Sequence, residues 1–213
     1  MRRVRIWLLL AVAVLVFGRA QALAQEITPA QVDQFNSLSN QAADLSSRYF
    51  ILDGQPRVPP DRDKLAQAVA LWDQAIAIYP SHWQTWWLKA KTQQALDDDA
   101  GALASLQRAY GLAPHEQAVV NEMTIEAMKV GNIDLAMRAT NLALTDFPND
   151  LATVDRLALL QLLTADLDHA IATANRALQI APGDNVALSI IGVANQVRAG
   201  QRAQPHALSD LQP

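Results

Sequence analysis

Residues 68–80 read AVALWDQAIAIYP, and the spacing of two alanines and the proline in this stretch returns along the chain. Ala68, Ala75 and Pro80 are each followed by the same residue type 34 positions later, and this step is then made twice more. The later copies are Ala102, Ala109 and Pro114; Ala136, Ala143 and Pro148; and Ala170, Ala177 and Pro182. Because small and rigid residues stay in register over four copies, the middle of the chain is predicted to be an array of structural repeats.

The composition of the 213 residues is that of a chain able to build its own core. Apolar residues make up 51% of the chain, which is enough for one medium domain. There is no cysteine, so disulfide bonds, thiolate metal sites and cysteine nucleophiles are excluded. Helix packing alone must therefore hold the array together.

The N-terminal segment, 1–24, has the pattern of a signal peptide. A basic start (Arg2, Arg3 and Arg5) precedes an apolar run over 6–17, and Ala22-Leu23-Ala24 has the form of a cleavage site. That apolar run is shorter than the roughly 20 residues of a bilayer span, which favours cleavage after Ala24 over retention as an anchor. We therefore expect a periplasmic or secreted protein with no membrane span after cleavage.

Removal of this segment would make the chain more acidic. Without its four arginines the mature chain carries 13 basic residues against 21 acidic ones, a net charge of −8. Such a surface repels phosphate backbones, and no basic stripe offsets it. Nucleic acid is therefore not expected as a partner.

Apolar periodicity, prolines and capping residues predict helices over most of the chain. After Thr28-Pro29 one helix should run to about Phe50, and another should span about 63–79. Between them, 51–62 holds one glycine and three prolines and should be a loop. Paired helices should then cover about 82–96 with 99–112, 116–130 with 133–146, and 150–165 with 167–180, followed by an unpaired helix over 185–199. Residues 200–213 are expected to form a disordered tail.

The register resembles that of the tetratricopeptide repeat (TPR) family, whose helix pairs recur with a period of about 34 residues. Ala68, Trp72, Ala75 and Pro80 match the second-helix half of that motif, whereas the first helices match less well: Trp86 takes the tryptophan position, but Lys89, Ala90 and Gln93 follow it. The resemblance covers about 63–199. It implies an all-α fold, a right-handed superhelical solenoid of antiparallel helix pairs closed by an unpaired C-terminal helix.

The N-terminal part, 25–62, departs from this register. A first helix for the first repeat should begin near Tyr49, but the Pro-rich loop stands there instead. We interpret the helix over 29–50 as that missing helix, displaced and joined by the loop. Whether the 51–62 loop is functional or a tolerated insertion is left open by the sequence.

Because the family's concave face is lined by first helices, the resemblance also indicates where a partner would bind. Three sets of positions keep the spacing of the repeat, are left over by the stacking pattern and form one stripe on each first helix. They are Trp87, Asn121, Asp155 and Ser189; Lys91, Ile125, Leu159 and Val193; and Gln94, Met128 and Leu162. Stacked, they predict a groove with an apolar centre that suits an extended or helical peptide, although Leu162 could equally be ordinary core.

Other kinds of site are not indicated. The family's clamp for C-terminal carboxylates is incomplete, because Trp87, Glu122 and Ala152 stand where clamp residues would be beside Lys91 and Arg156. None of the four histidines (His82, His115, His169 and His206) has a ligand partner four residues on, so no metal or cofactor is predicted. Phosphate loops and nucleophile elbows are missing from the sequence, and a non-catalytic protein is expected.

The sequence is consistent with two kinds of function. The first is an exported adaptor, or scaffold, that holds a segment of another envelope protein in its groove. The second is a structural component of a secretion, polysaccharide-export or cytochrome c maturation assembly, using the outer face and the 51–62 loop. The sequence leaves partner, pathway and oligomeric state open.

Overall fold

The computed structural model describes residues 27–50 and 58–211, and within these ranges it is helical, with no strand. The α-helices are α2 (Pro29–Ser46), α3 (Arg62–Ile78), α4 (Trp83–Ala95), α5 (Asp99–Leu112), α6 (Gln117–Lys129), α7 (Ile133–Asp146), α8 (Leu151–Leu163), α9 (Leu167–Ile180) and α10 (Asn185–Arg198). Two short 3₁₀ helices are η1 (Ser47–Tyr49) and η2 (Leu208–Leu211). The predicted all-α fold is confirmed, and the signal peptide and most of the predicted loop lie outside the described residues.

Most helices begin at a residue whose side chain caps the first turn. The side chains of Asp61, Asp98, Asn132 and Asp166 accept a hydrogen bond from the backbone N–H three residues on, at the starts of α3, α5, α7 and α9. Thr28 and Gln31 form a reciprocal capping box at the start of α2. Each such cap satisfies backbone donors that the helix leaves unpaired, which stabilises it by about 1 kcal/mol.

Three first helices, α4, α6 and α8, end in the same backbone geometry. Asp97, Gly131 and Ala165 are equivalent positions in successive repeats and have positive φ angles of 62°, 76° and 63°. Each donates its N–H to a carbonyl three residues back, and the next residue donates to a carbonyl five residues back. This paired closure is a Schellman motif, which reverses the chain so that the second helix can begin at once.

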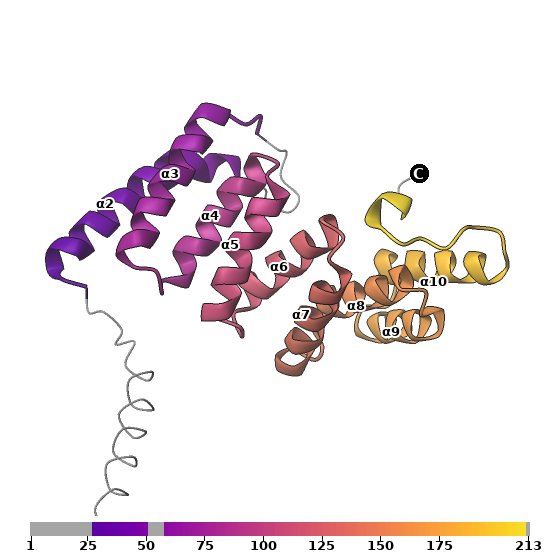
Figure 1. Cartoon of the computed structure of the whole chain (residues 1–213). Coiled ribbons are helices and arrows are strands. Elements are labelled where there is room, and N and C mark those ends of the chain that lie inside the picture. Colours follow the sequence, from indigo (N-terminus) through magenta and orange to yellow (C-terminus); the bar gives the residue numbers. More distant parts are fainter. Residues whose placement is uncertain (1–26, 51–57, 212–213) are drawn as a thin grey trace, which may run out of the picture.

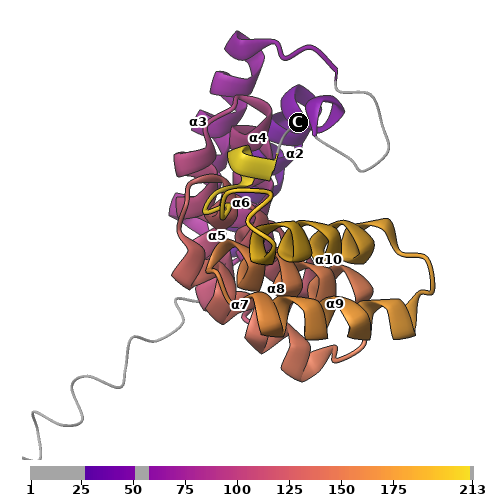
Figure 2. The same cartoon turned by 90° about the vertical axis from the view of Figure 1, so that its right-hand side faces the viewer.

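The helix pairs stack in chain order, each on its neighbours, into a superhelical solenoid (Figure 1). The helices α3, α4 and α5 run steeply in Figure 1, whereas α9 and α10 run across the view in both Figure 1 and Figure 2. The repeated alanines of the second helices are all buried at the contacts, among them Ala75, Ala109 and Ala177. Their small side chains allow close helix packing, as the sequence predicts.

The helix α2 belongs to the array. It packs along α3 and also reaches α4, as a first helix of the first repeat should. Its Phe35 ring makes T-shaped contacts with the rings of Tyr79 and His82, with ring centroids 5.8 and 5.1 Å apart. This agrees with the interpretation of 29–50 as a displaced first helix.

The chain after α10 differs from the expectation of a disordered tail. Residues 201–211 turn back over the array and end in η2, seen in yellow in Figures 1 and 2. Gln204 donates a hydrogen bond to the backbone oxygen of Leu162, and Pro205 is buried. Leu208 and Leu211 pack against the core of the array. Apolar burial by these two leucines therefore holds a segment that has no helical periodicity of its own.

Candidate protein-binding groove

A cavity of about 350 Å³ opens on the side of the array formed by the first helices. Three successive first helices and the folded-back tail line it: Ile125 and Met128 of α6; Ala152, Asp155, Arg156 and Leu159 of α8; Val186 of α10; and Leu208. We call this surface the α6–α8 groove. Its walls are mostly apolar, and it is as large as a small ligand site in other proteins.

Four residues of the predicted groove meet here, namely Ile125, Met128, Asp155 and Leu159. Ile125 is the most open of them, with 39% of its surface exposed. A side chain this apolar and this exposed on a packed helix is available to cover a partner's side chain. The register of the repeat thus brings together three residues of the predicted apolar centre, Ile125, Met128 and Leu159, but not Leu162.

The N-terminal part of the predicted stripe is not open. Lys91 and Gln94 of α4 are buried and bond to acidic residues of α6: Lys91 Nζ lies 2.7 Å from Glu122 Oε1, and Gln94 Nε2 lies 2.9 Å from Glu122 Oε2 and 2.8 Å from Glu126 Oε1. Lys129 Nζ also bonds to Glu126 Oε1 at 2.7 Å. Lys91, Gln94, Glu122, Glu126 and Lys129 form what we call the α4–α6 polar seam, which ties two neighbouring first helices together.

The remaining predicted residues lie apart from the cavity. The ring of Trp87 packs against the core, and its indole N–H is buried without an acceptor among the described residues. Leu162 is 1% exposed and belongs to the core. On α10, Ser189 bonds to its own helix, and Val193 packs on the C-terminal core cluster. Asn121 lies next to the groove, because its Oδ1 accepts a hydrogen bond of 2.9 Å from Arg156.

Four lining residues of the groove and three members of the seam lie outside the predicted stripes: Ala152, Arg156, Val186 and Leu208 in the groove, and Glu122, Glu126 and Lys129 in the seam. Leu208 falls in the segment predicted to be disordered, and Val186 stands outside the predicted stripes. Glu126 lies one position beyond Ile125, so the stripes pass beside it. Glu126 is fully buried. The only sequence feature that could have indicated this is the presence of two possible donors for its carboxylate, Gln94 and Lys129.

Asp155 is the exceptional residue of the groove. Only 7% of it is exposed, its Oδ1 is buried, and neither oxygen has a hydrogen bond or ion pair with a described residue. Burial raises the pKa of this carboxyl to about 6, and the nearby charge of Asp184 adds to the rise, while Arg156 opposes it. A buried carboxylate normally keeps donors around it, so this arrangement is costly for the fold.

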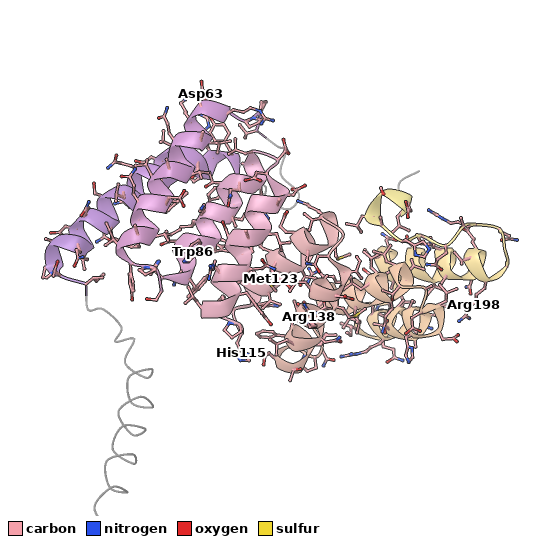
Figure 3. The ribbon with its side chains drawn as sticks, in the orientation of Figure 1. Asp63, Trp86, His115, Met123, Arg138 and Arg198 are labelled. Atoms are coloured by element: carbon pink, nitrogen blue, oxygen red, sulfur yellow. The ribbon has the colours of Figure 1, made fainter. Side chains whose placement is uncertain are left out.

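Two histidines in the described ranges each lie against a single aspartate. His115, at the turn before α6 (Figure 3), places Nδ1 2.7 Å from Asp146 Oδ2, and His169 Nδ1 lies 2.8 Å from Asp166 Oδ1. Over 27–50 and 58–211, no group of three or more histidine or acidic side chains gathers in a way that could hold a metal ion. In the same ranges, the helices are too short or too polar to cross a membrane.

The fold and the groove define a class of protein, a solenoid of helix pairs built on one repeated register. Solved structures of that class superimpose on this chain, so the chain has the TPR fold. MamA shares 17% identity at a TM-score of 0.59, over 66% of this chain and 82% of that one. A TPR protein from Parabacteroides merdae shares 13% at a TM-score of 0.66, over 79% of this chain and 61% of that one.

A further solved structure is YrrB, described as a TPR protein with an unusual peptide-binding site. It shares 17% identity at a TM-score of 0.58, over 70% of this chain and 75% of that one. No family model matches the sequence. No curated protein matches it either.

Proposed function

We propose that this chain is an exported, non-catalytic adaptor that holds a peptide segment of another envelope protein in the α6–α8 groove. The observation that carries the proposal is the cavity itself. It joins apolar side chains from three successive first helices to one buried carboxylate that has no partner among the described residues. A TPR fold supports a role in protein–protein interaction, and YrrB, which has the same fold, is described as having a peptide-binding site.

The groove has the size and chemistry of a peptide site. Its apolar walls would bury one or two side chains of a partner, at about 1.5–3 kcal/mol for each large apolar side chain. The backbone of an extended or helical segment would lie along the first helices. The α4–α6 polar seam closes the surface on the N-terminal side, so the contact centres on α6 and α8 and not on α4.

Export is the second part of the proposal, and it is supported by the pattern of 1–24 alone. Fractionation of cells that make the full chain should place it outside the cytoplasm. Mass spectrometry of the purified protein should find Gln25 at its N-terminus. A cytoplasmic protein that keeps Met1 would overturn this part.

Photo-crosslinking in living cells would test the groove. A photoreactive amino acid at Ile125, which lies in the groove, should capture a partner protein, whereas the same residue at the exposed Leu112 of α5, away from it, should not. Introducing Leu159→Glu into the Ile125 crosslinking chain should abolish the product. Equal capture from both positions would contradict the groove as the binding site.

A further inference from the structure

Asp155 gives the groove a chemical preference that its apolar walls alone would not have. Its carboxylate lines the cavity, is more than nine-tenths buried, and has one fully buried oxygen that accepts no hydrogen bond from a described residue. A carboxylate in this state has lost its hydration without gaining a donor, which disfavours the charged form in the empty groove. A donor brought by a partner would remove that cost.

The charges around Asp155 are mainly negative. Asp184, at the start of α10, raises the pKa of Asp155, and Asp150, Glu122 and Asp155 all act on the guanidinium of Arg156. Arg156 is the one cation among the residues that line the cavity, but it gives its hydrogen bond to Asn121 and makes no ion pair with Asp155 in the described chain. The site therefore attracts a positive group more strongly than a neutral donor.

Glu126 provides a useful contrast. It is more deeply buried than Asp155, at 0% exposed, and one of its oxygens also lacks a partner among the described residues. Its other oxygen, however, accepts hydrogen bonds from Gln94 and Lys129, and it does not line the cavity. Glu126 is thus part of the seam between two helices. Asp155 has no such internal role and faces a space that a ligand can enter.

The tail supplies one wall of the groove. Leu208 is among the residues that line the cavity, and η2 places Leu211 three residues further along the same short helical turn. A leucine on a helical turn therefore fits against Met128 and its neighbours. No basic side chain of the tail lies among the residues that line the cavity, so Asp155 is left for another chain.

We propose that the α6–α8 groove is selective for a partner segment in which a lysine or arginine reaches Asp155 while a neighbouring apolar residue covers Ile125 and Leu159. This inference rests on the proposed function, because it names the class of peptide for the same site. The basic group forms a shielded ion pair with the carboxylate, and the apolar residue excludes water from it. A segment rich in acidic residues would be repelled here.

A displayed library of short random peptides, selected on the full chain, would test this. The selected peptides should combine a basic residue with an apolar one. A synthetic copy of the leading peptide should bind Asp155→Asn about tenfold more weakly or worse, because a desolvated charge pair is lost. A peptide with norleucine in place of the basic residue should lose this preference and bind Asp155→Asn at least as tightly as the parent chain, because it would cover the carboxylate without pairing it. Asp134→Asn, an exposed acid on α7, removes the same charge elsewhere and should change nothing.

Failure of the charge preference and failure of the groove as the binding site give different results. Peptides that lose binding with Ile125→Glu but bind Asp155→Asn as well as the parent overturn the charge preference and leave the groove standing. Peptides that bind Ile125→Glu unchanged overturn the groove itself. A selection that yields no binding peptide overturns both. Thermal unfolding by circular dichroism confirms that each variant is folded before it is compared.

Discussion

Gly131 and Ala165 occupy the same position in successive repeats and share a left-handed backbone, with φ angles of 76° and 63°. Both close a first helix through the same pair of backbone hydrogen bonds. Only one of them is the residue type that adopts this conformation without strain. Ala165 therefore stores a small strain that Gly131 avoids.

We predict that Ala165→Gly stabilises the protein by about 0.5–1 kcal/mol, since the relief of left-handed strain exceeds the added freedom of the unfolded chain. Gly131→Ala should destabilise it by about 1 kcal/mol. A Cβ added at Gly131 meets no atom within 4 Å, so the cost would be one of backbone strain alone. Urea unfolding followed by circular dichroism measures both changes. Loss of stability in Ala165→Gly would contradict the argument.

Asp155→Asn should stabilise the protein at pH 8. The pKa of Asp155 is raised to about 6 in the folded chain from an ordinary value of 3.8, so the folded state binds more protons between these values. Stability due to this group therefore falls as pH rises through that window and stays low above it. The gain in Asp155→Asn should be about 1–3 kcal/mol at pH 8 and should vanish below about pH 4.

The charged groups that act on Asp155 are Asp184 of α10 and Arg156 of its own helix, and both remain in the variant. Urea midpoints of parent and variant, compared at each pH, isolate the single carboxyl. Asp134→Asn serves as the control and should show no such pH-dependent gain. A variant less stable than the parent at pH 8 would mean that Asp155 supports the fold.

Breaking the α4–α6 polar seam should be costly. Lys91→Met keeps the aliphatic stem but leaves Glu122 without its 2.7 Å ion pair in a largely buried setting. A loss of about 2–4 kcal/mol in the free energy of unfolding is expected. Lys64→Met removes an exposed pair with Asp61 and should cost less than about 1 kcal/mol. Similar losses in the two variants would show that the seam is dispensable.

The folded-back tail should depend on its leucines. Leu208→Asp places a charge against the apolar wall, so hydrogen exchange at 204–211 should speed up by about tenfold or more while α3 to α5 stay protected. Ser209→Asp, an exposed neighbour on the same turn, should leave exchange unchanged. Fast exchange of this segment in the parent chain would contradict the packed arrangement.

The sequence predicts the helices well because the alanines and prolines fix a local geometry that repeats. Alanines such as Ala102 and Ala136 indicate tight contacts between helices, and prolines such as Pro114 and Pro148 indicate where each helix pair ends. The apolar centre of the groove follows from the same register. These features depend on spacing along one helix or between adjacent pairs, which a sequence displays directly.

The features that could not be predicted from the sequence depend on contacts between residues that are far apart in the chain. Its register places Lys91 on an open surface, but α4 and α6 approach closely enough for this side chain to reach Glu122. The packed tail cannot be predicted from the sequence, because the hydrogen bond from Gln204 to Leu162 joins residues 42 positions apart and no sequence pattern indicates it. The strained backbone of Ala165 carries no glycine signal, so only the structure reveals it.

Neighbour-only stacking has one more consequence. A one-dimensional stack opens most readily from its ends, and α8, α10 and the returning segment form the C-terminal end. Local unfolding of this end would therefore remove the cavity while the N-terminal helices, indigo and magenta in Figure 1, are still folded. Peptide binding in the cavity and folding of that end are linked equilibria. A bound peptide therefore stabilises the C-terminal end of the solenoid against local unfolding.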